Sequence, residues 1–194
     1  ALILVVLGLS GGADAREPEW YYQAIDEVHS VAISEDGEYI FSAAPYGSTV
    51  YFFEKDNNTP SWSYDLDSNI GNVDISADGE YAVTFSKWSS DDLERLYLFE
   101  KESSTPLWNY SFIGDGSGDP YPNILTVAIS ANGEYIVASD SDEKVYLFGK
   151  NSSTPLWISN QENNSATGDI ESLSISADGE YIVAGSASKI HLFH

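Results

Sequence analysis

The sequence contains no cysteine and no methionine, and its 194 residues include 8 basic side chains against 31 acidic ones. Without cysteine there is no disulfide bond, no thiolate nucleophile and no cysteine-ligated metal. The formal net charge of −23 repels the phosphates of a nucleic acid or an anionic bilayer. We therefore expect no nucleic-acid partner. Such a charge is also typical of very soluble proteins and of proteins adapted to high salt.

What the sequence does contain is a repeat, in a chain whose 42% hydrophobic and 13% aromatic residues can form a core. The unit occurs as VAISEDGEYIFSA from Val31, VDISADGEYAVTF from Val73, VAISANGEYIVAS from Val127 and LSISADGEYIVAG from Leu173. The apolar runs that follow are VYFFEK from Val50, LYLFEK from Leu96, VYLFGK from Val145 and IHLFH from Ile190. After three of these runs comes a Thr-Pro-x-Trp signature, which ends at Trp62, Trp108 and Trp157.

Each unit has the composition of antiparallel β-structure. Short runs of Val, Ile, Tyr and Phe are bounded by Asp-Gly, Asn-Gly or Thr-Pro, which are turn and hairpin signals. Four strands in a repeat of about 40 to 50 residues predict a blade of a β-propeller. We therefore expect an all-β fold of four-stranded antiparallel blades.

The blade count depends on the first residues after the N-terminal segment. The fourth unit ends at His194 without a fourth strand, but Pro18 and Trp20 match the Pro-x-Trp pattern of the other units. We predict that this N-terminal strand completes the last blade and closes a four-bladed ring. The alternative is part of a ring with seven or eight blades.

From Glu19 to His194 the chain resembles the WD-repeat-like and quinoprotein-like propellers of bacterial and archaeal surface proteins. The Ser-x-Asp-Gly-x-Tyr turn, seen at Ser34–Tyr39 and Ser76–Tyr81, carries this resemblance. The Gly-His and Trp-Asp pairs of true WD repeats are missing, so their intracellular scaffold roles are not implied. No constellation for calcium and a quinone is visible, and we expect no cofactor.

The polar residues of the repeat have structural interpretations. The acidic turns could suggest calcium, but Asn132 replaces Asp in the third copy, and Asn-Gly forms the same turn without the charge. His191 takes the place of a recurring tyrosine, and the sequence defines no Ser or Asp as a triad partner of His29. We predict no catalytic residue, no enzymatic activity and no defined metal site.

The long loops all belong to one face of the predicted propeller. Variable loops on a rigid scaffold are where recognition usually occurs, so this face is a candidate binding site for a glycan, a divalent cation or another surface protein. Its residues are Trp88, Asp91, Asp92, Asp115, Asp119, Tyr121, Asp140 and Asp142. Solvated acidic loops are the simpler interpretation.

Four Asn-x-Ser/Thr sequons favour an extracellular, glycosylated protein. They begin at Asn57, Asn109, Asn151 and Asn163. Together with the acidic surface and the N-terminal segment, they predict a location at the cell surface.

Residues 1–15 form an apolar segment ahead of the propeller of residues 16–194. Its apolar residues are Ala1, Leu2, Ile3, Leu4, Val5, Val6, Leu7 and Leu9. They are too few for a membrane-spanning helix, so we do not expect a transmembrane protein. The segment is either a signal-peptide remnant, with Ala-x-Ala ending at Ala15, or a retained assembly tail.

These features lead to one main hypothesis about function. A retained apolar segment beside a closed ring would pack against a neighbouring copy, and head-to-tail contacts of this kind give open fibres. We therefore predict a non-enzymatic, pilus-like surface protein that polymerises with itself. The alternative is a secreted or tethered recognition module that binds through the long-loop face.

Overall fold

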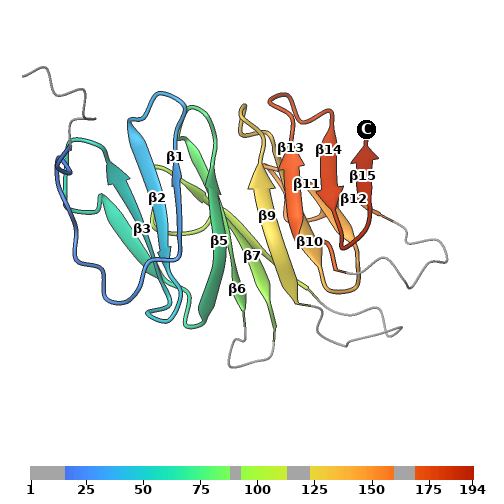
Figure 1. Cartoon of the computed structure of the whole chain (residues 1–194), viewed down its shortest axis with the longest axis horizontal. Coiled ribbons are helices and arrows are strands. Elements are labelled where there is room, and N and C mark those ends of the chain that lie inside the picture. Colours follow the sequence, from blue (N-terminus) through green and yellow to red (C-terminus); the bar gives the residue numbers. More distant parts are fainter. Residues whose placement is uncertain (1–15, 88–92, 113–122, 160–168) are drawn as a thin grey trace, which may run out of the picture.

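The computed structural model describes residues 16–87, 93–112, 123–159 and 169–194, and its regular elements in these ranges are β-strands. Four antiparallel sheets, here called blades 1 to 4, stand side by side in chain order (Figure 1). Blade 1 contains β1 (Ser30–Ile33), β2 (Tyr39–Ala44), β3 (Thr49–Glu54) and β4 (Trp62–Asp65). Blade 2 contains β5 (Asn69–Ile75), β6 (Tyr81–Lys87), β7 (Arg95–Glu100) and β8 (Trp108–Ser111). Blade 3 contains β9 (Ile124–Ile129), β10 (Tyr135–Asp140), β11 (Val145–Gly149) and β12 (Pro155–Ile158). Blade 4 contains β13 (Ser172–Ile175), β14 (Ile182–Gly185) and β15 (Ile190–Phe193).

The first hairpin of every blade closes through the same tight turn. In blade 1, Asp36 Oδ1 accepts hydrogen bonds from the Ser34 hydroxyl at 2.6 Å and from the Glu38 N–H at 2.9 Å. Gly37 follows with a φ of 74°, a conformation that is costly for a residue with a Cβ. Asn132 accepts the same two bonds in blade 3. The carboxylates of this turn are therefore turn-forming acceptors, as the sequence predicts.

The core lies between neighbouring blades. β1, β5, β9 and β13 are adjacent in that order. Between blades 2 and 3, the buried side chains of Val83, Leu96 and Leu98 pack in one cluster with Val127 and Ile129. The corresponding positions form a second cluster between blades 1 and 2 and a third between blades 3 and 4. A blade with two neighbours therefore buries both faces of its sheet.

The predicted all-β fold of propeller type is confirmed, but closure of a four-bladed ring is not. Within the described residues, blade 4 has three strands, and it stands at the opposite end of the row from blade 1 (Figure 1). The segment around Trp20 packs against β3 of blade 1 and does not pair with β15. The reason is that, within the described residues, β15 has no fourth strand beside it and the contacts of Trp20 are made to blade 1 alone.

Candidate functional site

The segment around Trp20 occupies the place of a fourth strand from a blade ahead of blade 1. Trp62 and Trp108, in fourth strands, donate their indole N–H to Lys101 O at 2.6 Å and to Lys150 O at 2.7 Å in the next blade. Trp20 donates its indole N–H to Lys55 O in blade 1 in the same way. Its ring lies 5.6 Å from that of Phe53, and the ring of Trp62 lies 5.4 Å from that of Phe99. Trp20 thus has the contacts that a fourth-strand tryptophan makes with the next blade. It does not, however, belong to any of the four sheets.

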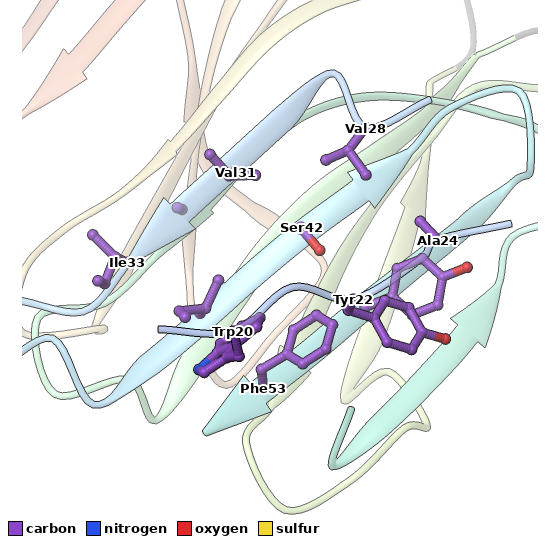
Figure 2. Close-up of a pocket in the computed structure, with 11 residues that line it drawn as sticks. Trp20, Tyr22, Ala24, Val28, Val31, Ile33, Ser42 and Phe53 are labelled. Carbon is purple, nitrogen blue, oxygen red and sulfur yellow. The ribbon is translucent and has the colours of Figure 1, made fainter. Parts of the chain in front are cut away.

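The first exposed surface is the face of blade 1 that points away from blade 2. We call it the leading face. Val31 and Ile33 are exposed on it, Ile40 is half-buried, and Tyr51 and Phe53 are buried against Tyr22 and Trp20. A cavity of about 500 Å³ lies over it, bounded on one side by Trp20 and Tyr22 (Figure 2). Val31 is 68% exposed, whereas Val73 at the same position of blade 2 is 6% exposed. The segment around Trp20 therefore covers the leading face incompletely.

The second exposed surface is the opposite face, on blade 4. We call it the trailing face, and it consists of Tyr181, Val183, Ile190 and Leu192. Val183 is 40% exposed, whereas Val83 and Val137 at the same position of blades 2 and 3 are completely buried. Ile190 and Leu192 are also exposed. Apolar side chains that fill the core inside the row therefore face solvent at its end.

In blades 1 and 2, one tyrosine is held by two groups of the next blade. Tyr39 lies against Gly79, where an added Cβ would come within 2.3 Å of the tyrosine ring, and under Lys101 Nζ, 4.8 Å from the ring centre. Lys101 also donates a hydrogen bond to Glu80 at 2.5 Å, which raises the pKa of the lysine above its ordinary range. Tyr81 is held in the same way by Gly133 and Lys150, with Lys150 Nζ 5.0 Å from the ring centre. We call this arrangement the tyrosine clamp.

The two ends of the row each carry part of a clamp. In blade 1, an added Cβ at Gly37 would have open space except for Ile33 Cδ1 at 4.0 Å. Beside it, Lys55 is paired with Glu38, and the hydrogen bond between them raises the pKa of the lysine. In blade 4, Tyr181 is 46% exposed. The glycine and lysine of a clamp therefore lie at one end of the row, and its tyrosine lies at the other.

The structure describes two of the eight residues predicted for the binding face. Asp140 is buried, and its carboxylate accepts hydrogen bonds from the Tyr146 hydroxyl at 2.6 Å and from the Asp142 and Lys144 N–H groups at 3.0 Å. Burial raises the pKa of Asp140. The Asp142 carboxylate lies 3.7 Å from Lys144 Nζ. These two residues have partners within their own turn. The other six, Trp88, Asp91, Asp92, Asp115, Asp119 and Tyr121, lie outside the described residues.

The remaining predicted sites are only partly described. Asn57, Asn109 and Asn151 are exposed, while Asn163 and the assembly residues Ala1–Leu9 lie outside the described ranges. In the described ranges, no group of three or more acidic or histidine side chains could hold a metal ion. The same ranges contain no helix with the length and apolarity needed to cross a membrane.

The leading and trailing faces could not be recognised from the sequence as exposed. Their residues follow the same alternation as buried residues of the other blades, and a repeat does not reveal which copies lack a neighbour. His191 could be interpreted correctly. Its ring stacks 6.3 Å from Phe193, as Tyr97 stacks 6.3 Å from Phe99, so it takes the place of the recurring tyrosine.

No protein-family model matches the sequence. No curated protein matches it either. Among solved structures, the chain is similar to the β-propeller domain of Cps50 (Swd1) from Myceliophteria thermophila, with a TM-score of 0.64 and 13% sequence identity. The alignment covers 86% of this chain and 51% of that chain, so this chain spans about half the length of that one. At this identity the similarity shows the fold alone, a propeller of the WD40-like kind.

Proposed function

We propose that this chain is a non-enzymatic structural protein of the cell surface, which assembles with copies of itself as the subunit of a pilus-like filament. The observation that carries the self-association in this proposal is the exposure of apolar side chains at both ends of the row. Apolar surface of this kind typically marks contact with another protein. The leading and trailing faces differ from each other, which favours head-to-tail contacts between copies.

The surface location is supported by the sequons and the charge. Asn57, Asn109 and Asn151 are all exposed, as an acceptor of an N-linked glycan must be. The net charge of −23 keeps such a protein soluble outside its assemblies.

Two N-terminal segments have different roles in this proposal. Residues 1–9 link copies into the filament, because a short apolar segment is stabilised when a neighbouring copy covers it. The segment around Trp20 takes the place of a fourth strand, because its contacts with Lys55 and Phe53 are those of a fourth-strand tryptophan.

Deletion of residues 1–12 tests the filament. Electron microscopy of the full chain should show filaments, and the deletion should abolish them while circular dichroism still reports a folded β-protein. A matched variant that replaces Leu4, Val5 and Leu7 with serine keeps the chain length and should also lose filaments. Filaments of unchanged number and length in both variants, or no filaments from the full chain, would overturn the proposal.

A further inference from the structure

The contacts between neighbouring blades repeat, and each repeated contact is left half-made at the two ends of the row. The tyrosine clamp joins Tyr39 to Gly79 and Tyr81 to Gly133, and Tyr135 also lies against Gly179. Continuing this series by one blade would place Tyr181 against the glycine of a following blade. Gly37 is the glycine of this series that the preceding tyrosine has not filled. The end of the series is therefore complementary to its beginning.

The fourth strands give a second half-made contact. Trp62 pairs with Phe52 of its own sheet, Trp108 with Leu98, and Trp157 with Leu147. The equivalent position in blade 4 is Leu192, and blade 4 has no fourth strand within the described residues. Trp20 already has the contacts that a fourth-strand tryptophan makes with the next blade. What it needs on its other side is a three-stranded sheet such as β13–β15.

The hairpin turns give a third contact that is half-made at the two ends of the row. The Glu35 N–H donates to Ala77 O at 2.9 Å, the Ala77 N–H donates to Ala131 O at 2.9 Å, and the Asn132 N–H donates to Ala177 O at 3.1 Å. These bonds join the turns of successive blades in one direction. The next bond in the series would run from the turn of blade 4 to the carbonyl of Glu35.

We infer that the leading and trailing faces are the two halves of one blade–blade interface, and that two copies of this chain join head to tail through them. In this dimer, the segment around Trp20 of each copy becomes the fourth strand of β13–β15 in the other. Tyr181 of each copy enters the clamp formed by Gly37 and Lys55 of the other. The inference rests on the self-association of the proposed function and names the surface and the partner.

Two observations favour a second copy as the occupant. The two faces stand at opposite ends of the row, so one copy cannot join its own (Figure 1). The half-made contacts at one end of the row are the complements of those at the other end, so a second copy can supply what each end lacks. A ring made in this way contains two identical interfaces and leaves no face uncovered.

The charge of the chain makes the dimer sensitive to salt. Each copy carries a net charge of −23, so two copies repel each other, while the faces that meet are mostly apolar. Salt screens the repulsion and strengthens apolar association. The dimer should therefore become tighter as the sodium chloride concentration rises.

Sedimentation of the full chain, after filaments have been pelleted, tests the inference. We expect a species of twice the 21.2-kDa chain mass, with a dissociation constant that falls with salt. Leu192→Glu, on the trailing face, should weaken the dimer by about 100-fold or more, because it places an unpaired charge in an apolar contact. Leu156→Glu is the matched control, since Leu156 is 59% exposed on β12 and belongs to neither face. It should change the dissociation constant by less than about 3-fold.

Mixing variants tests the head-to-tail geometry. Ile33→Glu blocks the leading face and leaves the trailing face intact, and Leu192→Glu does the reverse. Each variant alone should be monomeric, but an equimolar mixture should form dimers through the one interface that remains intact. If Ile33→Glu misfolds by circular dichroism, Gly37→Ala, which adds one methyl group where Tyr181 would enter, replaces it; if Leu192→Glu misfolds, Ile190→Glu on the same trailing face replaces it.

Several outcomes would overturn the inference. A full chain that stays monomeric at high salt would show that something other than a second copy covers these faces. Equal weakening by Leu156→Glu and Leu192→Glu would show that the contact lies elsewhere, and monomers in the mixture would exclude head-to-tail pairing. These results are separate from the filament test. A dimer in a chain lacking residues 1–12 supports the ring whether or not the full chain forms filaments.

Discussion

Leu98 and Leu192 occupy the same position in two blades and have opposite environments. Leu98 of β7 is completely buried between blades 2 and 3, whereas Leu192 of β15 is 66% exposed at the end of the row. Both lie in a strand of alternating large side chains, and both strands pair with the second strand of their own blade. The difference is therefore set by the neighbour and not by the blade itself. The same position of a blade is thus buried where a neighbouring blade covers it and exposed where none of the described residues does.

The largest expected effect separates these two leucines. Leu98→Ala should destabilise the protein by about 2–5 kcal/mol, because it leaves a cavity in a packed core. Leu192→Ala should change the stability of the monomer by less than about 0.5 kcal/mol. Urea unfolding at low protein concentration and low salt measures both. Equal losses of stability would show that the end of the row is packed like its interior.

The glycine turns provide the next comparison. Gly79→Ala combines a left-handed backbone, φ 70°, with a Cβ 2.3 Å from the ring of Tyr39, and should cost at least about 2 kcal/mol. Gly37→Ala has the same backbone conformation with open space, and should cost about 1 kcal/mol. The free energies of unfolding of the two variants give the difference. A Gly37→Ala variant as unstable as Gly79→Ala would show that the turn of blade 1 is already filled.

The clamp lysines should show a smaller difference in stability, and the larger loss should again be the one inside the row. Lys101→Met removes both the contact with the Tyr39 ring and the bond to Glu80, and should cost about 1 kcal/mol. Lys55→Met removes an exposed pair with Glu38 and should have a smaller effect in the monomer. Thermal unfolding of the two variants at equal salt measures this. A larger effect at Lys55 would contradict the assignment of the clamps.

The smallest effect concerns Asp140 in blade 3, whose position in blade 4 is taken by Ser186. Burial raises the pKa of Asp140 in the folded protein above its value in the unfolded chain. The folded state then binds the proton more tightly, so this carboxyl adds stability as the pH falls through its folded pKa. Asp140→Asn lacks this group and can keep the turn, so it should be more stable than the parent at pH 7, by about 1 kcal/mol or less.

Urea unfolding of the parent and of Asp140→Asn at pH 7 and pH 4 checks the sign. The advantage of the asparagine variant should shrink at the lower pH, because the folded parent takes up a proton on Asp140 more readily than the unfolded chain does. An advantage that grows toward low pH would mean that the charged form of Asp140 is the stabilising one.

Much of the fold could be predicted because the information is local. The alternation in VAIS and VYFF, and the Asp-Gly turn with its serine, specify strands and hairpins within a few residues. The contacts of Trp20, which match those of a fourth-strand tryptophan, were also predictable, since Pro18 and Trp20 repeat the pattern of the other units. Closure was not predictable, because it depends on the angle between packed sheets, which adds up over the whole row.

The candidate site was harder to predict than the fold. Asp140 and Asp142 were expected in a solvated binding face, yet Asp140 is buried and bonds to its own turn. A possible signal was Tyr146, two residues after Lys144, at a position that is buried in every internal blade. The exposed faces had no signal, because the same types of apolar residue occupy these positions in blades with a neighbour and in blades without one.

The contacts of Trp20 also bear on how a protein of this kind can change its length. The stretch of sequence that recurs, from one tryptophan to the next, begins in the last strand of one blade and ends before the last strand of the following blade. A duplicated or deleted stretch of this length would therefore carry interlocking ends with it. The first strand of the added stretch would become the fourth strand of the preceding blade. Its other three strands would form a new blade, and the fourth strand of that blade would come from the stretch that follows. Duplication of this stretch would then add one blade, and its deletion would remove one, without a change in the residues of the blade–blade contacts.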